Sequence, residues 1–128
     1  MIVTTSLPSS VMWSILVRHS QESAPLLQVD PDRVCATASI GKVLLLITAA
    51  EQLETGALEE GDILSRETVV PVADSGLWQH LAASTLAVTD VCALVGAISD
   101  NLATNVLMDA IGLDAVSATG RRLGMTDS

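Results

Sequence analysis

The apolar residues of this chain follow two different patterns, one before residue 30 and one after it. Val11–His19 is rich in Val, Ile, Leu and Trp, and Leu26–Val29 is a second short apolar run, so this part predicts two strands. Residues 21–25 predict the turn between them, which makes the pair a hairpin. An isolated hairpin is only marginally stable in water. Because nothing after residue 30 clearly adds a strand, we expect the partner strands to belong to sequence absent from this chain.

After residue 30, the apolar residues form longer runs that predict helices. Ser39–Thr55 is apolar almost all round, which is typical of a helix buried inside the protein, and Gly56 provides its stop. Three further helices are predicted, at Val91–Ile98 after an N-cap at Thr89-Asp90, at Leu102–Ile111 before Gly112, and at Asp114–Leu123 before Gly124. Between these helices, Ile63–Val72 is expected to be irregular or briefly extended, and Trp78–Ala83 to form a short helical piece. Beyond the hairpin, the pattern therefore predicts only helix and loop.

Length and composition narrow the class of protein. The 128 residues suit one domain, and 49% hydrophobic with 16% charged residues is typical of a well-filled globular fold. We expect this domain to consist of a disordered terminus (1–10), a hairpin (11–29) and a helical part (39–128). The net charge of −9 argues against nucleic acid or an anionic membrane as a partner, because both require clustered Lys and Arg. No apolar run approaches the roughly 20 residues that span a bilayer.

The residues that commonly bind metals or form disulfides indicate no site of their own. Cys35 and Cys92 each lie among apolar residues, so we expect two buried free thiols. His19 and His80 lack the spacing of metal ligands and are expected on the surface or in loops. Trp78 is expected to pack in the core, the alternative being a wall of a substrate cleft. We predict neither a metal nor another cofactor.

The start of the predicted buried helix carries the first candidate chemistry. Ser39 and Lys42 share one face of a helix, and Lys42 is the only lysine in the chain. A serine hydroxyl becomes nucleophilic when a base takes its proton, and a lysine in its neutral form can be that base. Backbone N–H groups at the helix start, including that of Ser39, can also donate to an oxyanion. The alternative is an N-cap serine beside a lysine that extends into solvent.

A second candidate lies between two predicted helices, at Ser99-Asp100-Asn101. A hydroxyl, a carboxylate and an amide on one exposed turn can relay a proton and bind a polar group of a substrate. The alternative is a helix cap and turn, because Ser, Asp and Asn are common in both.

Together, the two motifs resemble those of the penicillin-recognising serine enzymes, and most closely the class A β-lactamases. The two serines are 60 positions apart, at 39 and 99, as in that family. Asp100–Leu107 and the glycines that end helices, Gly112 and Gly124, also look like the family, and the resemblance covers residues 12–128. It implies an α+β fold of the β-lactamase/transpeptidase type, with helices on both faces of an antiparallel sheet that absent sequence would complete.

The resemblance also implies a role for each motif residue. Ser39 would be the acylated nucleophile, and Lys42 would accept its proton directly or through water. Ser99 would pass a proton to the leaving nitrogen of the opened ring. Asn101 would bind the amide side chain of the substrate and hold Lys42 in place, whereas Asp100 would be structural.

The chain departs from the family pattern in three respects. Asn105 matches the position that anchors the loop with the deacylating glutamate, but that glutamate would come beyond Ser128. The Lys-Thr-Gly strand of the family is absent, because the only lysine already belongs to Ser-x-x-Lys. Cys92 matches one half of a disulfide found in many members, but Leu46 occupies the partner position. The resemblance therefore implies the first half of such an enzyme, incomplete and inactive by itself.

Three functions are compatible with these motifs. The first is a serine hydrolase that forms an acyl-enzyme with β-lactam antibiotics; the second is a D,D-peptidase or esterase relative with the same Ser–Lys pair. The third is a non-catalytic fragment that pairs its hairpin edge with a complementing chain. The expected partners are a small β-lactam or peptide-like substrate and a second polypeptide with the Lys-Thr-Gly strand, but no nucleic acid and no membrane. The resemblance implies a periplasmic or secreted location, although no signal peptide is recognised in this chain.

Overall fold

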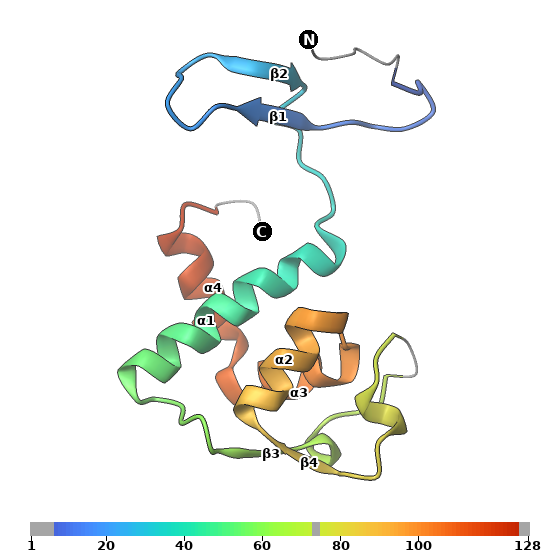
Figure 1. Ribbon diagram of the computed structural model, residues 1–128, viewed down its shortest axis with the longest axis vertical. Coiled ribbons are helices and arrows are strands. Elements are labelled where there is room, and N and C mark those ends of the chain that lie inside the picture. Colours follow the sequence, from blue (N-terminus) through green and yellow to red (C-terminus); the bar gives the residue numbers. More distant parts are fainter. Residues whose placement is uncertain (1–6, 73–74, 126–128) are drawn as a thin grey trace. The chain divides into compact units, whose positions relative to one another are not determined.

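The computed structural model describes residues 7–72 and 75–125 of the chain (Figure 1). Part of the terminus predicted to be disordered (1–10) therefore lies outside the described residues. The chain divides into two compact units, Met1–Ala36 and Thr37–Ser128, and each is described here by itself. All candidate catalytic side chains belong to the second unit.

The first unit contains an antiparallel hairpin of β1 (Ile15–Arg18) and β2 (Pro25–Val29). Both strands lie where the sequence predicts strands, but β1 is shorter than the predicted Val11–His19. The first residue of β1 pairs with the last residue of β2, and Asp30 then turns the chain with a positive φ of 38°. Among the described residues, the segment before β1 thus has no strand to pair with.

Four α-helices form most of the described part of the second unit (Figure 1). They are α1 (Lys42–Thr55), α2 (Val88–Ile98), α3 (Asn101–Ile111) and α4 (Leu113–Arg122). The helix α1 contacts each of the other three. The largest fully buried apolar side chains between them are Trp78, Leu45, Leu107, Val88, Val91 and Val106. Apart from the tryptophan this core is aliphatic, as a sequence without Phe or Tyr requires.

A second, smaller sheet lies before α2. The strand β3 (Ile63–Ser65) pairs in antiparallel register with β4 (Thr85–Ala87). The strand β3 lies within Ile63–Val72, which was predicted to be irregular or briefly extended, whereas the prediction of only helix and loop is wrong for β4. Each has three residues, which is too short to leave a readable alternation of apolar and polar positions.

The helix α2 begins earlier than predicted. Its N-cap is Ala87, which makes no side-chain cap hydrogen bond, and the Val88 N–H instead donates to the Asp62 carbonyl at 2.9 Å. The predicted cap at Thr89-Asp90 is thus wrong. A side chain was expected to accept from the first N–H groups of the helix, but the backbone carbonyl of Asp62 accepts from one of them instead.

The last two helices follow each other almost without a gap. The predicted helices over Leu102–Ile111 and Asp114–Leu123 are confirmed to within about one residue at each end. Gly112, with a positive φ of 87°, is both the C-cap of α3 and the N-cap of α4. The helix α4 is joined to α1 through Glu51, which accepts a hydrogen bond from Thr119 Oγ1 (3.0 Å) and pairs with Arg122.

The helix α1 is less buried than its composition predicts. It is preceded by a single 3₁₀ turn, Ala38–Gly41, and its buried residues form one stripe of Leu45, Thr48 and Ala49. Ile40 and Val43 are 75% and 55% exposed in the described structure. The prediction of a helix buried all round is therefore wrong here, because α2, α3 and α4 cover only part of its surface.

Candidate active site

Lys42, the first residue of α1, holds the candidate site together. Its Nζ donates hydrogen bonds to the Ser99 carbonyl at 2.7 Å, to Ser99 Oγ at 2.8 Å and to Asn101 Oδ1 at 2.6 Å. These three bonds use all three donors of an ammonium group. The side chain is half-buried and reaches across to the turn between α2 and α3, so it does not extend into solvent.

The acceptors around Lys42 suit two protonation states of its amine. The Ser99 carbonyl and Asn101 Oδ1 can only accept, whereas the Ser99 hydroxyl can accept or donate. A charged amine donates to all three, as described above. A neutral amine can keep its two N–H bonds to the two carbonyl oxygens, which leaves its one lone pair able to accept a hydrogen bond from a hydroxyl. No carboxylate in the described residues pairs with Lys42.

Ser99 adopts a backbone conformation that is uncommon for a serine. It ends α2 in the left-handed region, at φ 58° and ψ 38°. Such a conformation costs about 1 kcal/mol for a residue with a Cβ. In this turn, both the carbonyl and the hydroxyl of Ser99 lie against the Lys42 amine. Backbone strain of this kind persists where the surroundings over-determine it, often at functional sites.

Asp100 is fully buried between Ser99 and Asn101, yet its carboxylate forms no ion pair with Lys42. Its Oδ2 accepts from the backbone N–H groups of Leu77 (2.7 Å) and Trp78 (2.8 Å), and its Oδ1 accepts from that of Ala103 (2.9 Å). Burial by itself would raise the pKa of Asp100, but the backbone hydrogen bonds, that of Ala103 foremost, hold it below its ordinary value. The carboxylate is therefore both the N-cap of α3 and the anchor of the segment 75–78.

Ser39 lies in the 3₁₀ turn before α1, three residues before Lys42. Residues i and i+3 eclipse in such a turn, so Ser39 and Lys42 are on the same side of it. The Ser39 side chain is exposed, and within the described residues its hydroxyl makes no hydrogen bond. The preceding residue, Ala38, is left-handed at φ 47°. The structure thus joins Lys42 to Ser99 and Asn101 by hydrogen bonds, but not to Ser39.

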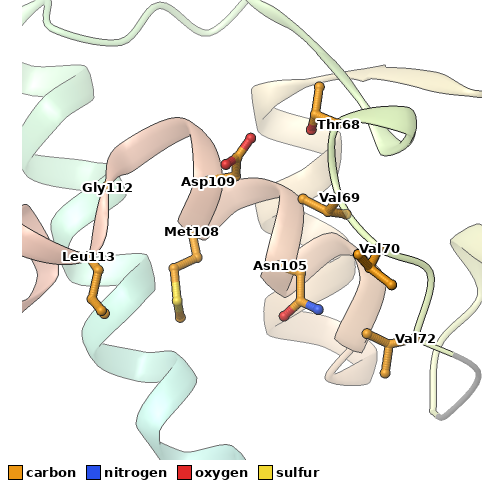
Figure 2. A pocket seen from close by; sticks show the side chains of 9 residues that line it. All are labelled: Thr68, Val69, Val70, Val72, Asn105, Met108, Asp109, Gly112 and Leu113. Carbon is orange, nitrogen blue, oxygen red and sulfur yellow. The ribbon is translucent and has the colours of Figure 1, made fainter.

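Asn105 lines a separate groove. It lies one turn after Asn101 on α3, and its amide makes no hydrogen bond within the described residues. Figure 2 shows this amide at a groove of about 600 Å³, with Val69, Val70 and Met108 among its apolar walls. Neither Ser39, Lys42 nor the Ser99 turn lines this groove.

The remaining candidates do not join the site. Both cysteines are free; Cys35 is exposed, so its predicted burial is wrong, and burial raises the pKa of the half-buried Cys92 thiol. His19 and His80 are exposed, as predicted. Trp78 is 0% exposed and its indole donates to the Ala83 carbonyl, so the alternative of a cleft wall is wrong. No group of residues that could hold a metal, and no helix long and apolar enough to cross a membrane, occurs in residues 7–72 and 75–125.

Gly76 and the backbone N–H groups of Leu77 and Trp78 were not predicted to belong to the site. A glycine and two backbone N–H groups carry no side-chain chemistry that the sequence could reveal. Their role follows from a hydrogen bond across more than 20 residues to Asp100.

Comparison with known proteins shows similarity to β-lactamases and to the protein PBP-A. A family model described as "Beta-lactamase enzyme family" matches residues 7–128. No curated protein sequence matches the chain. Among solved structures, a β-lactamase from Sphaerobacter thermophilus DSM 20745 is 35% identical with a TM-score of 0.71, covering 80% of this chain and 39% of that one.

Two solved structures of PBP-A are also similar. One is 24% identical with a TM-score of 0.70, covering 80% of this chain and 39% of that chain. The other, a mutant described as an acyl-enzyme complex with penicillin G, is 25% identical with a TM-score of 0.68, covering 77% and 38%. The chain therefore spans about two fifths of the length of these structures. Its helices and small antiparallel sheets adopt part of their fold, which confirms the predicted α+β class.

Proposed function

The chain belongs to the β-lactamase enzyme family, and from that membership we propose that Ser39 is the nucleophile of a serine hydrolase that forms an acyl-enzyme with β-lactams. In the proposed reaction, Ser39 Oγ attacks the carbonyl carbon of the lactam amide. The hydroxyl proton passes to the neutral Lys42 amine, directly or through water. Water later cleaves the resulting ester and restores Ser39.

Ser99 completes the proton transfer in this proposal. When the C–N bond of the lactam breaks, the leaving nitrogen takes a proton from the Ser99 hydroxyl. Lys42, which holds the proton from Ser39, returns one to Ser99 along the 2.8 Å hydrogen bond between Nζ and Oγ. The charges and protons therefore balance without a group from outside the site.

Asn101 orients both Lys42 and the substrate in this proposal. Its Oδ1 accepts from Lys42 Nζ at 2.6 Å, which leaves the amide NH₂ group available to a carbonyl on the substrate side chain. The backbone N–H of Ser39, near the start of a helical turn, is the proposed oxyanion donor.

One observation carries the proposal, namely the three hydrogen bonds of Lys42. The two motifs are separated by 57 to 59 residues, and the only lysine of the chain connects them. A lysine that merely extended into solvent beside a capping serine would make none of these bonds.

The first candidate function is a β-lactamase, whose substrate is a β-lactam. The second candidate function is a D,D-peptidase or esterase relative that uses the same Ser–Lys pair. Penicillin G suits the test because the structure of a PBP-A mutant, 25% identical to this chain, is described as its acyl-enzyme complex. The two candidates share the acylation step. They differ in the lifetime of the ester, which is short in a β-lactamase and long in a peptidase.

The proposed active form includes a second polypeptide that carries a Lys-Thr-Gly strand. This chain spans about two fifths of the β-lactamase that it resembles, and it contains no Lys-Thr-Gly sequence. The isolated chain is therefore expected to acylate slowly and not to turn over a chromogenic cephalosporin. Steady hydrolysis by the isolated chain would contradict the need for that strand.

The test is covalent labelling with a tagged penicillin, followed by peptide mass analysis. We expect the label on Ser39 in the wild-type chain and in Ser117→Ala, which removes an exposed hydroxyl on α4. Ser39→Ala should abolish the label. A label on another residue, or an unmodified Ser39 after prolonged exposure to saturating penicillin, would overturn the assignment.

A further inference from the structure

Asp100 uses its backbone to fix the turn between α2 and α3. Its N–H donates to the Leu94 carbonyl of α2 at 3.2 Å. Its carbonyl accepts from the N–H of Thr104 at 3.0 Å and from Thr104 Oγ1 at 2.6 Å, both on α3. The residue therefore ties the end of one helix to the start of the next, directly between Ser99 and Asn101.

The Asp100 side chain ties in a third part of the chain. Its carboxylate holds the N–H groups of Leu77 and Trp78, and the Asn101 N–H donates back to the Ser75 carbonyl at 2.9 Å. In the described residues, no Lys, Arg or His pairs with this carboxylate. A buried charge without a cation is costly, so it persists only because backbone N–H groups replace water around it.

Gly76 makes the close approach of this segment possible. Its φ is +150°, and a Cβ built on it would lie 2.6 to 2.8 Å from the Asp100 carboxylate atoms. Any residue other than glycine would therefore push the carboxylate away from its three N–H partners. The position of Asp100 thus depends on a residue 24 positions earlier in the chain.

We propose that Asp100 is a positioning residue, which acts with Gly76 to set the left-handed turn at Ser99 and, through it, the position of the Lys42 amine. The reasoning is geometric. Within the part of the chain that the structure describes, the Lys42 amine donates hydrogen bonds to Ser99 and Asn101 alone, and these two residues flank Asp100 on both sides. A shift of Asp100 moves both of them, so the hydrogen-bond acceptors of Lys42 move together. The inference rests on the proposed function only in naming Lys42 and Ser99 as reacting groups.

The test uses the fact that Lys42 is the only lysine. Lysine labelled with ¹³C at Cε gives a single side-chain signal in the intact chain, and its chemical shift reports the hydrogen bonds of the amine. This readout requires no catalytic activity. A failure of this inference is therefore distinguishable from a failure of Ser39 labelling.

Two variants perturb Asp100 in different ways. Asp100→Asn replaces one accepting oxygen with a donor, and Gly76→Ala displaces an intact carboxylate. We expect each variant to move the Lys42 signal of the folded chain by more than its line width, toward the position in Ser99→Ala. The control is Gly112→Ala, which strains a glycine of similar positive φ (+87°) but meets no atom within 4 Å. It should lower the melting temperature and leave the Lys42 signal in place.

The proposal is overturned if the Lys42 signal has the same position in wild type, Asp100→Asn and Gly76→Ala although the melting temperatures of the variants are lower. Asp100 would then be a purely structural residue. If Asp100→Asn does not fold, Gly76→Ala decides, because it keeps the carboxylate itself and changes only its position. If neither variant folds, the wild-type chain is titrated with acid while the Lys42 signal is followed. A signal that moves before the chain unfolds supports the proposal, and a signal that stays in place overturns it.

Discussion

The two serine-bearing turns of the candidate site are built in opposite ways. The Ser99 turn is tied to α2, α3 and the segment 75–78, and both polar groups of its serine contact Lys42. The Ser39 turn is a single 3₁₀ turn with an exposed serine, an exposed Ile40 and no side-chain cap. Both turns contain a left-handed residue, at Ala38 and at Ser99. The Ser99 turn, to which we assign proton transfer in the proposed function, is therefore held firmly, whereas the Ser39 turn, which carries the proposed nucleophile, is held by little more than its own backbone.

This contrast indicates where the chain resists substitution. The Asp100 carboxylate ties the Ser99 turn to two other segments, so its loss leaves backbone N–H groups buried and unpaired. Contacts around Ser39 are few, so substitutions there should affect reactivity more than folding. Four predictions test this difference, from the largest expected effect to the smallest.

Asp100→Ala should have the largest effect on folding. It leaves the N–H groups of Leu77, Trp78 and Ala103 without their acceptor, so we expect a loss of about 4 kcal/mol in the free energy of unfolding. Urea unfolding followed by circular dichroism measures it. Asp109→Ala, which removes an exposed carboxylate from the same helix, should stay within about 0.5 kcal/mol of wild type. Equal losses in the two variants would remove the proposed contrast.

Lys42→Ala should affect chemistry far more than folding. Loss of the base should slow the acylation of Ser39 by about 10²- to 10⁴-fold. The free energy of unfolding should change by less than about 1 kcal/mol, because the oxygen atoms that it leaves are partly exposed. Rates of labelling by penicillin and urea unfolding give the two values. Unchanged labelling would separate Lys42 from the proposed reaction.

Acid should weaken the Ser99 turn through Asp100. Burial acts to raise the pKa of Asp100, but its backbone hydrogen bonds hold it below the ordinary value of about 3.9. A carboxyl with a lowered pKa in the folded state adds stability above its unfolded pKa, and this stability disappears as the pH falls through the folded pKa. The stability difference between wild type and Asp100→Asn should thus be constant above about pH 5 and narrow below about pH 4. Urea unfolding across that range measures it, and a difference that widens toward low pH would contradict the prediction.

Ala38→Gly should have the smallest effect, and a favourable one. Glycine removes the cost of the left-handed conformation, about 1 kcal/mol, but adds entropy to the unfolded chain, so we expect a net gain of about 0.5 kcal/mol. Ala118→Gly, in the exposed middle of α4, should instead lose about 1 kcal/mol. A loss in Ala38→Gly like that of the control would mean that the left-handed geometry carries no strain.

The sequence predicts the fold best where local signals decide it. The helices α3 and α4 were predictable because Asp100 caps one and Gly112 separates them. The strands β3 and β4 were not, because three-residue strands exist only through their pairing with each other. The exposure of Val43 could not be predicted either, since it depends on which neighbours cover α1 rather than on the composition of α1.

The candidate site was predictable from its motifs but not from its contacts. The Ser-x-x-Lys motif suggested that Lys42 pairs with Ser39, three positions earlier in the chain. Only the family resemblance linked Lys42 with Asn101. In the structure, the Lys42 amine instead donates hydrogen bonds to Ser99 and Asn101, which are distant from it in the sequence. The closeness of Gly76 to Asp100 had no sequence signal, because it depends on backbone approach rather than on side-chain chemistry.

Gly112 has a consequence for engineering of this chain. Since this one residue caps both α3 and α4, the junction has no spare length. A single inserted residue would turn α4 by about 100° relative to α3 and carry Arg122 away from Glu51. Tags, labels or permuted ends are therefore better placed at the exposed Gly61, which no neighbouring atom crowds and which lies outside every helix and strand described here.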